Sequence, residues 1–312
     1  MLSWFAREKK APGWFAASLD ANALAFAHGR RTPGGAAAIA AFGLRPVGSE
    51  KSGLLKAAQE MHLERYQCLT LLPARDYQLL LVEAPNVPRP ELKSAMRWRI
   101  KDMIDYHVDD ATLDVLDIPP DESGASRGHF MYAVCARNDL IQARIKSFQE
   151  ARIPLSVIDI PETAQRNIAA LFEEVDRGVA LAYFGDDWGL LTINFRGELY
   201  LARRLEFGLK QLGSPDATAR QEAMDRVALE LQRTFDHFDR QFHHVVISKL
   251  LLAPMPQDIG LAEFLAKNVT LPVESIDLGS KLAFDGAGPD AATQRHLFHH
   301  FGAALRYEGK AL

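Results

Sequence analysis

Apolar runs separated by short turns follow one another most regularly between residues 178 and 208. The runs are Val179–Tyr183, Gly189–Phe195 and Glu198–Leu205, and glycine, aspartate or arginine occupies the gaps between them. Short apolar runs with such boundaries are typical of buried strands rather than helices. The pattern therefore predicts three consecutive strands joined by tight turns.

A similar pattern occurs near the N-terminus. The apolar run Trp14–Leu19 meets an acid at Asp20, Ala23–Ala27 follows, and His28-Gly29 is the next expected turn. The distance between the two strand–acidic turn–strand units is far longer than the period of a solenoid repeat. We therefore predict two related lobes, each built around one such hairpin.

Strand and helix patterns alternate between the two hairpins, which is typical of an α/β (α+β) fold. The predicted strands are Tyr66–Leu72, Tyr77–Val82, Ala111–Ile118, His129–Cys135 and Leu155–Ile160, and the predicted helices are Ser52–His62, a helix from Pro90 to Ile104, Asn138–Ala151 and Glu162–Glu174. In the helix that begins at Pro90, Trp98 lies off the apolar stripe. A large ring in that position is either a second packing surface or a partner contact.

The second half of the chain contains the longest predicted helix. It begins after Ser214-Pro215 and has apolar residues at spacings of three and four as far as Phe242. A strand, Val245–Leu252, a helix, Leu261–Asn268, and a final helix, Ala292–Leu305, follow. The predicted units are 1–65 (first lobe, N-terminal part), 66–150 (an inserted β/α module), 151–177 (return to the first lobe), 178–290 (second lobe) and 291–312 (C-terminal helix closing the fold).

Composition excludes several classes of protein. The 312 residues carry a formal charge of −4, which gives no general attraction to nucleic acid, and the basic pairs Arg30-Arg31 and Arg203-Arg204 are isolated. Two cysteines, Cys68 and Cys135, lie in apolar runs and are too few for a disulfide scaffold, so we expect buried thiols in a reducing compartment. No apolar run reaches the length of a membrane span. A cytoplasmic protein with no nucleic-acid partner is therefore expected.

Several long motifs carry a resemblance to a known family. They are RDYQLLLVEAPNVPRPELKSAMRWRIKDMIDYHVDDATLDVLDIP at Arg75–Pro119, IDIPETAQRNIAALF at Ile158–Phe172, FRGELYLARRLEFG at Phe195–Gly208 and LELQRTFDHFD at Leu229–Asp239. In these motifs and in the order of its elements the chain resembles the PilM-type actin-like pilus-assembly proteins, relatives of FtsA. The closer likeness is to the MSHA-pilus biogenesis proteins of the MshI type.

This resemblance implies a fold and a role. The implied fold is a two-lobed actin-like (FtsA/PilM-type) fold with a small β/α module inserted in the first lobe. The implied role is a cytoplasmic scaffold of type IV pilus biogenesis, peripherally associated with the inner membrane, that docks the N-terminal tail of a bitopic PilN-like protein between the lobe and its module. The pilus assembly motor and a second copy of the chain are further candidate partners.

Actin-like ATPases carry an Asp-x-Gly pattern in each of two facing hairpin turns, where it serves magnesium and phosphate. Here the first turn is Asp20-Ala21-Asn22 and the second is Tyr183-Phe184-Gly185, so each has lost half of the pattern. Prolines at 254 and 256 occupy the expected place of the adenosine loop, where they remove backbone N–H groups. We therefore predict a pseudo-ATPase without catalytic residues or a required cofactor.

The alternative is an ATP-binding switch that controls the same assembly. Asp20, Asn22, Gly185 and Asp186 would then surround ATP and magnesium, with Asp186 as a displaced acidic ligand. An aspartate in a hairpin turn is also explained by backbone hydrogen bonding alone. Both hypotheses remain open from the residues.

The candidate partner-binding residues are Arg97, Trp98 and Tyr106, because arginine and aromatic side chains off the core stripe are common in interfaces. They could equally pack inside the module. His296, His299 and His300 are close enough on a helix to suggest a metal, but no third ligand stands at a recognisable spacing. Partly exposed helix histidines are the alternative, and no metal site is predicted.

Overall fold

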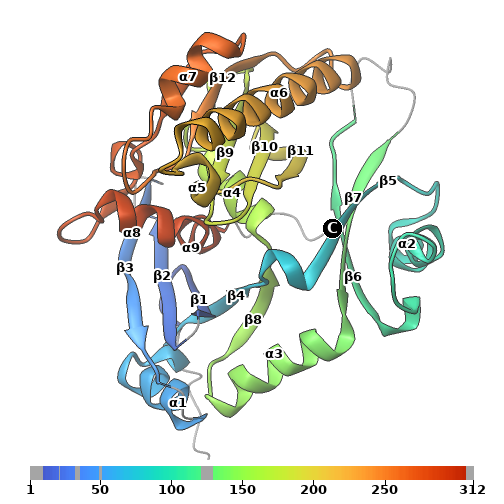
Figure 1. Cartoon of the computed structure of the whole chain (residues 1–312). Coiled ribbons are helices and arrows are strands. Elements are labelled where there is room, and N and C mark those ends of the chain that lie inside the picture. The colour runs from blue at the N-terminus through green and yellow to red at the C-terminus, as the bar shows by residue number, and fades with distance from the viewer. Residues whose placement is uncertain (1–9, 21, 32–35, 49–50, 121–128, 307–312) are drawn as a thin grey trace, which may run out of the picture.

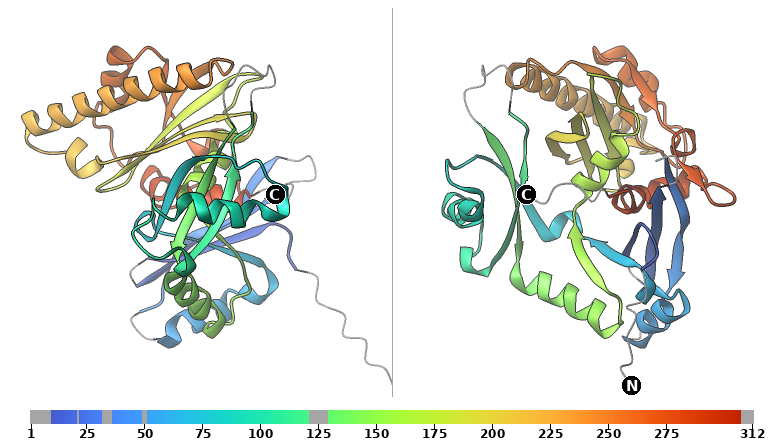
Figure 2. Two further views of the ribbon diagram at one scale, coloured as in Figure 1. Left: turned by 90° about the vertical axis from the view of Figure 1, so that its right-hand side faces the viewer. Right: turned by 180° about the vertical axis from the view of Figure 1, so that it is seen from behind.

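Three β-sheets, with helices around and between them, organise the chain (Figure 1). The structure is a computed structural model, and it describes residues 10–20, 22–31, 36–48, 51–120 and 129–306. Two of the sheets are stacked one above the other in Figure 1, and the third stands beside them with its own helix on the outside. The views in Figure 2 show the same division from the side and from behind.

The first sheet has six strands in the order β14-β3-β2-β1-β4-β8. Their bounds are β1 Trp14–Asp20, β2 Ala23–Arg31, β3 Ala37–Pro46, β4 Gln67–Leu71, β8 Leu155–Asp159 and β14 Ala283–Phe284. The predicted N-terminal hairpin is confirmed, but the expected turn at His28-Gly29 is wrong. Strand β2 continues through Gly29. A glycine is required at this position because a Cβ would lie 2.2 Å from the carbonyl oxygen of Ala304.

The second sheet has five strands in the order β11-β10-β9-β12-β13. Their bounds are β9 Gly178–Phe184, β10 Gly189–Phe195, β11 Glu198–Leu205, β12 Ile247–Leu252 and β13 Val273–Ser275. Every residue of β9 and β10 is buried. Such strands read as continuous apolar runs because both of their faces are covered, which is why their pattern was clear in the sequence. The predicted triple hairpin is confirmed.

The third sheet belongs to a small module that is inserted in the first lobe, between β4 and β8 in sequence. It has the antiparallel order β5-β7-β6, with β5 Tyr77–Glu83, β6 Ala111–Asp117 and β7 Phe130–Arg137. Helix α2, Leu92–Ile100, packs on one face, and α3, Asn138–Glu150, leads from β7 back to β8. The predicted helix from Pro90 to Ile104 is shorter at both ends, because a 3₁₀ turn precedes Leu92 and turns follow Ile100.

The other helices cover the first two sheets. Their bounds are α1 Lys51–Glu60, α4 Pro161–Ala169, α5 Leu209–Leu212, α6 Ala217–Gln241, α7 Leu261–Asn268, α8 Ala291–His296 and α9 Phe298–Ala304, with short 3₁₀ turns that include η2 Ala74–Asp76. Helix α6 covers the second sheet with the apolar residues predicted from its spacing. The single predicted C-terminal helix is wrong, because Leu297 leaves the helical conformation and separates α8 from α9.

The chain crosses between the lobes more than once. Strand β14 lies within the predicted second lobe, 178–290, but it pairs with β3 at the edge of the first sheet. Helix α9 likewise packs against β1, β2 and α4, and its Phe298 and Phe301 are part of a core that the two lobes share. The first lobe is therefore completed by residues near the end of the described chain.

Both cysteines are buried and free, as predicted. The Cys68 thiol donates to the carbonyl of Leu63, and burial raises its pKa to about 12. Burial also raises the pKa of Cys135, to about 11. Thiols with raised pKa values are poor nucleophiles at neutral pH, so these residues act as core side chains. Among the described residues, no helix is both long and apolar enough to cross a bilayer.

Candidate functional site

The two acidic turns are brought together by helix α8. Asp20 ends β1, and its Oδ2 lies 3.1 Å from Nε2 of His296. Asp186 lies in the turn between β9 and β10, and its Oδ1 accepts a hydrogen bond of 2.9 Å from Nη2 of Arg295. Because Arg295 and His296 are adjacent on α8, this one helix contacts a turn from each lobe.

Two further polar groups of these turns have partners within the chain. Asp187 Oδ2 lies 2.7 Å from Nζ of Lys210. The carbonyl of Asn22 accepts the backbone N–H groups of Val47 and Gly48, at 2.8 and 3.2 Å. The structure thus places Asp20, Asn22 and Asp186 in turns, as predicted, and each carboxylate of the two turns contacts a nitrogen of a basic side chain.

Four aromatic rings fill the space beside the second turn, and we call them the aromatic plug: Tyr183, Trp188, Phe298 and His299. The Tyr183 ring stacks on Phe298 with 5.4 Å between centroids and meets His299 edge-on at 4.4 Å. Trp188 stacks on His299 at 6.2 Å. The tyrosine that replaces the expected acid is therefore a buried packing residue that joins the second sheet to α9.

Gly185 is retained in the second turn for a local reason. A Cβ at this position would lie 3.2 Å from Nε1 of Trp188 and 3.3 Å from its carbonyl oxygen. The N–H of Gly185 donates to that same carbonyl at 2.8 Å, which closes the turn. The glycine therefore accommodates the Trp188 ring, so its presence does not require a phosphate.

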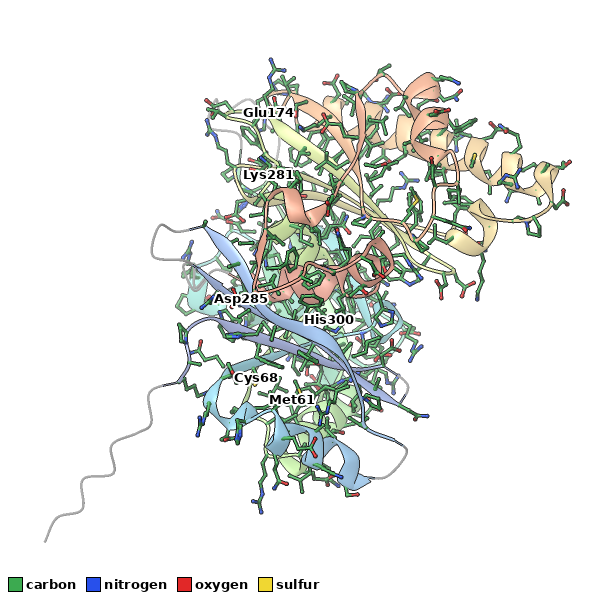
Figure 3. All side chains as sticks on the ribbon, turned by 90° about the vertical axis from the view of Figure 1, so that its left-hand side faces the viewer. Met61, Cys68, Glu174, Lys281, Asp285 and His300 are labelled. Atoms are coloured by element: carbon green, nitrogen blue, oxygen red, sulfur yellow. The ribbon has the colours of Figure 1, made fainter. Side chains whose placement is uncertain are left out.

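The histidines of α9 are more enclosed than predicted. His299 is buried, and Nε2 lies 3.4 Å from Oε1 of Gln165. Both ring nitrogens of His300 are enclosed without a hydrogen-bond partner among the described residues, and Figure 3 shows His300 at the level where the two lobes meet. Desolvation lowers the pKa of His299 to about 3 and that of His300 to about 4. The expectation of partly exposed histidines is wrong for His299, which is buried, whereas His296 is exposed and His300 is half-buried.

No cluster of ligands for a metal is formed in the part of the chain that the structure describes. Groups of three or more histidine, cysteine, aspartate or glutamate side chains in a metal-binding arrangement are absent there. His296 faces Asp20, whereas His299 and His300 are enclosed on α9. The three histidines therefore do not converge on one point.

The three candidate partner residues all lie on the α2 side of the module. Trp98 is 74% exposed, with the Lys101 ammonium 5.6 Å from its ring. Arg97 donates to the carbonyl of Val108 at 2.8 Å, and Tyr106 lies under the Arg137 guanidinium, 5.1 Å away. Arg97 and Tyr106 thus pack within the module, and only Trp98 projects from it. Figure 1 shows α2 on the outer side, away from the first lobe.

The opposite face of the module sheet meets the first lobe. Buried residues of both units pack together there, including Tyr77, Ala136 and Ile160. Around them is a group of half-buried apolar side chains that we call the module–lobe seam: Leu79, Leu116, Val134, Ile145 and Ile158. Leu81 lies on the same face of β5 as Leu79, since side chains alternate along a strand, and it is 41% exposed. The resemblance implied a docking site between the lobe and its module, but the sequence could not identify these residues because they come from five separate elements.

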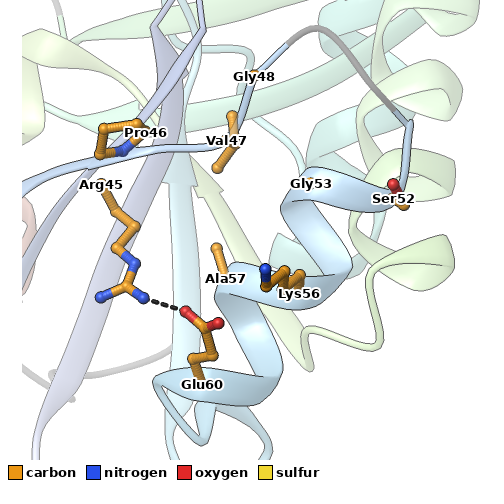
Figure 4. Close-up of a pocket in the computed structure, with 9 residues that line it drawn as sticks. All are labelled: Arg45, Pro46, Val47, Gly48, Ser52, Gly53, Lys56, Ala57 and Glu60. Atoms are coloured by element: carbon orange, nitrogen blue, oxygen red, sulfur yellow. Dashed lines mark hydrogen bonds and ion pairs between the residues drawn. The ribbon is translucent and has the colours of Figure 1, made fainter.

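A cavity of about 550 Å³ lies at the far end of the first lobe, between the end of β3 and α1 (Figure 4). The Arg45 guanidinium spans it to the Glu60 carboxylate, and Lys56 stands at its side. Close packing of the helix here depends on Gly53, where a Cβ would meet the carbonyl oxygen of Val47 at 1.7 Å. The cavity adjoins the first hairpin turn, because Val47 and Gly48, which line it, donate their backbone N–H groups to the carbonyl of Asn22.

Comparison with solved structures identifies the architecture. A structure described as the PilM-PilN type IV pilus biogenesis complex matches with a TM-score of 0.69 and 20% sequence identity, covering 96% of this chain and 97% of that chain. A Bacteroides thetaiotaomicron protein with an actin-like ATPase fold and unknown function matches with a TM-score of 0.50, 10% identity and coverage of 96% and 99%. The chain has an actin-like fold.

The predicted fold class is thereby confirmed, including its two lobes with a module beside them. The cytoplasmic domain of Vibrio cholerae EpsL, an inner-membrane component of the type II secretion system, is also similar, with a TM-score of 0.45, 12% identity and coverage of 91% and 94%. No family model and no curated protein matches the sequence. The actin-like fold of this chain is therefore recognised through its structure.

Proposed function

We propose that this chain is a cytoplasmic actin-like scaffold of type IV pilus biogenesis that docks the N-terminal tail of a bitopic, PilN-like inner-membrane protein. The observation that carries the proposal is the match, over nearly the full length of both chains, to the structure of the PilM-PilN complex. The motif resemblance adds the finer proposal of an MSHA-type system. Association with the inner membrane would then come through the partner.

The module–lobe seam is the surface that we assign to the partner's tail. Its apolar side chains come from two units and are only half covered, and Leu81 extends the same face toward solvent. An extended apolar segment placed there would complete the burial of these side chains. Trp98 lies on the other face of the module, so the two surfaces can be tested independently.

Leu81→Asp is expected to weaken binding of a synthetic peptide with the PilN-like tail sequence about tenfold or more, since it places a charge where about 1.5 kcal/mol of apolar burial is lost. Fluorescence anisotropy with a labelled peptide measures the effect. Trp98→Ala is the matched control on the α2 face and should leave the affinity unchanged. The reverse result, a loss with Trp98→Ala alone, would move the docking site to α2 and refute the seam.

We further propose that the scaffold works without nucleotide. Three features support this: side chains of α8 pair with Asp20 and Asp186, the aromatic plug fills the space beside the second turn, and Ala253 continues the pairing of β12 by donating to Ala182 at 2.9 Å. A divalent cation would have to displace Arg295 and His296 from the carboxylates. Magnesium and ATP therefore fit these turns poorly.

Millimolar Mg-ATP is expected to leave the melting temperature of the protein unchanged in a thermal-shift titration. A ligand that binds the native state at 100 times its Kd would add about 2.7 kcal/mol, which such a titration detects readily. The same titration on Asp20→Ala provides the control for a shift that arises elsewhere on the surface. A shift in the wild type that Asp20→Ala removes would establish the ATP-switch alternative instead.

A further inference from the structure

A buried carboxylate joins the module to both lobes. Glu162 lies in the first turn of α4 and is only 1% exposed. The Tyr77 hydroxyl, at the start of β5 in the module, donates a hydrogen bond to its Oε2. Nη2 of Arg204, from β11 of the second lobe, lies 3.5 Å from its Oε1. Three parts of the chain that are far apart in sequence thus meet at one acid.

Arg204 makes two further contacts with the module. Its guanidinium lies 4.6 Å from the centre of the Tyr77 ring, and Nη1 donates to the carbonyl of Ala74 in η2. Two residues earlier, at the free edge of β11, the N–H of Ala202 donates to the Tyr132 hydroxyl at 2.9 Å. Figure 1 shows β11 at the edge of the second sheet that faces the module. One edge strand therefore fixes the module against the second lobe.

Just beyond Arg204, the segment that leaves β11 is fixed to the second acidic turn. The N–H of Leu209 donates to the Gly185 carbonyl at 2.7 Å, and the N–H of Lys210 donates to the Asp186 carbonyl at 3.0 Å. Gly208 passes so close that a Cβ would lie 2.3 Å from the Asp186 carbonyl oxygen. Backbone contacts of this kind leave no room for sliding, so the turn and the exit of β11 form one rigid unit.

We propose that the segment from Arg204 to Gly208, at the end of β11 and just after it, is a strap that transmits the position of the second acidic turn to the module–lobe seam, with Arg204 as its positioning residue. The turn is held to α8 by the Asp186–Arg295 pair, the strap begins at Gly208, and it ends in the Arg204–Glu162–Tyr77 junction. The expected effect of the strap on partner affinity rests on the proposed function. Its expected effect on the dynamics of the module does not.

Hydrogen exchange of the full chain tests the strap without any partner. Arg295→Met is expected to raise the exchange rates of β5 amides about fivefold or more, the effect of a modest coupling free energy between distant sites. Arg204→Met should raise them as well. If the strap carries the effect, Arg295→Met adds no further acceleration in the Arg204→Met background.

Arg203→Met is the matched control. It removes the same charge from the neighbouring position of β11, but Arg203 faces α6 and pairs with Glu230. It should leave β5 exchange at the wild-type rate. Arg204→Lys keeps the positive charge but loses the planar guanidinium, so it should give a β5 exchange rate between those of the wild type and Arg204→Met. It replaces Arg204→Met in the experiment if that variant does not fold. Two results would overturn the proposal. One is that Arg295→Met accelerates exchange only in residues 183–188 and α8. The other is that Arg295→Met and Arg204→Met accelerate β5 exchange independently of each other.

Peptide affinity provides a second arm. In the wild type, Arg295→Met is expected to weaken binding of the PilN-like tail peptide, and in the Arg204→Met background it should change the affinity no further. If the wild-type protein fails to bind the peptide at all, the proposed function fails while the exchange result still decides the strap. If the peptide binds but Arg295→Met leaves its affinity unchanged in the wild type, the link from strap to seam is refuted.

Discussion

Gly302→Ala is expected to destabilise the protein by about 3 kcal/mol or more, although alanine usually stabilises a helix relative to glycine by up to about 1 kcal/mol. The reason is the crossing of α9 over α4. A Cβ at position 302 would lie 2.0 Å from the carbonyl oxygen of Ala164 and 2.7 Å from its carbonyl carbon. Since backbone atoms cannot rotate away, the two helices must separate and expose Ile168 and Phe298, which are fully buried between them and the sheets.

Urea unfolding followed by circular dichroism measures this change. Gly288→Ala is a suitable control, because its Cβ would meet only the edge of the Phe284 ring at 3.7 Å, which is ordinary contact. A total stability of about 5–15 kcal/mol is typical of a domain, so the expected loss is a large part of it. A Gly302→Ala variant as stable as the wild type would show that the two helices do not pack at this distance.

Acidification from pH 6.5 to pH 5 is expected to cost about 3 kcal/mol of stability through His299 and His300, because the slope for each ring rises toward about 1.4 kcal/mol per pH unit below pH 6.5. Both folded pKa values, about 3 and about 4, lie below the ordinary value of 6.5. The unfolded chain therefore takes up protons first as the pH falls. The stability that these neutral rings contribute is present above pH 6.5. It is lost progressively as the pH falls toward the pKa values of the folded state.

Unfolding free energies measured at several pH values test this expectation. His300→Leu should roughly halve the slope below pH 6.5 and cost little at pH 8, because its ring nitrogens have no hydrogen-bond partner to lose among the described residues. His107→Gln is the control, since its ring is exposed on the module. Equal slopes in the wild type and in His300→Leu would show that His300 does not remain neutral inside the fold.

The elements that were predicted correctly are those with a strong local pattern. The buried strands β9 to β11 and helix α7 have clear apolar runs or helical spacing, and their observed bounds are close to those expected. Strand β14 has only two residues and exists because it pairs with β3. No local pattern reveals a strand of that kind. The helix break at Leu297 also has no local signal in the sequence, because the helical spacing of apolar residues continues through it.

The candidate site was predictable in part. Asp20 and Asp186 do lie in two turns that one helix brings together, and Trp98 lies off the core stripe of α2 as expected. The sequence alone could not identify the basic side chain that pairs with each of these aspartates. Arg295 is separated from Asp186 by more than a hundred positions, and an ion pair between such residues follows from the fold rather than from spacing. The residues that form the seam could not be identified for a similar reason.

The return of the chain to its first sheet affects how the protein can fold during synthesis. Helix α9 and strand β14 supply core contacts and an edge strand to a sheet that begins at Trp14. Contacts between such distant parts of a chain form late, since the intervening loop must close first. The module sheet, in contrast, uses only residues 77–137. On the ribosome, the module can therefore form before the lobe that carries it, and the first lobe must wait for residues 283–304 to emerge.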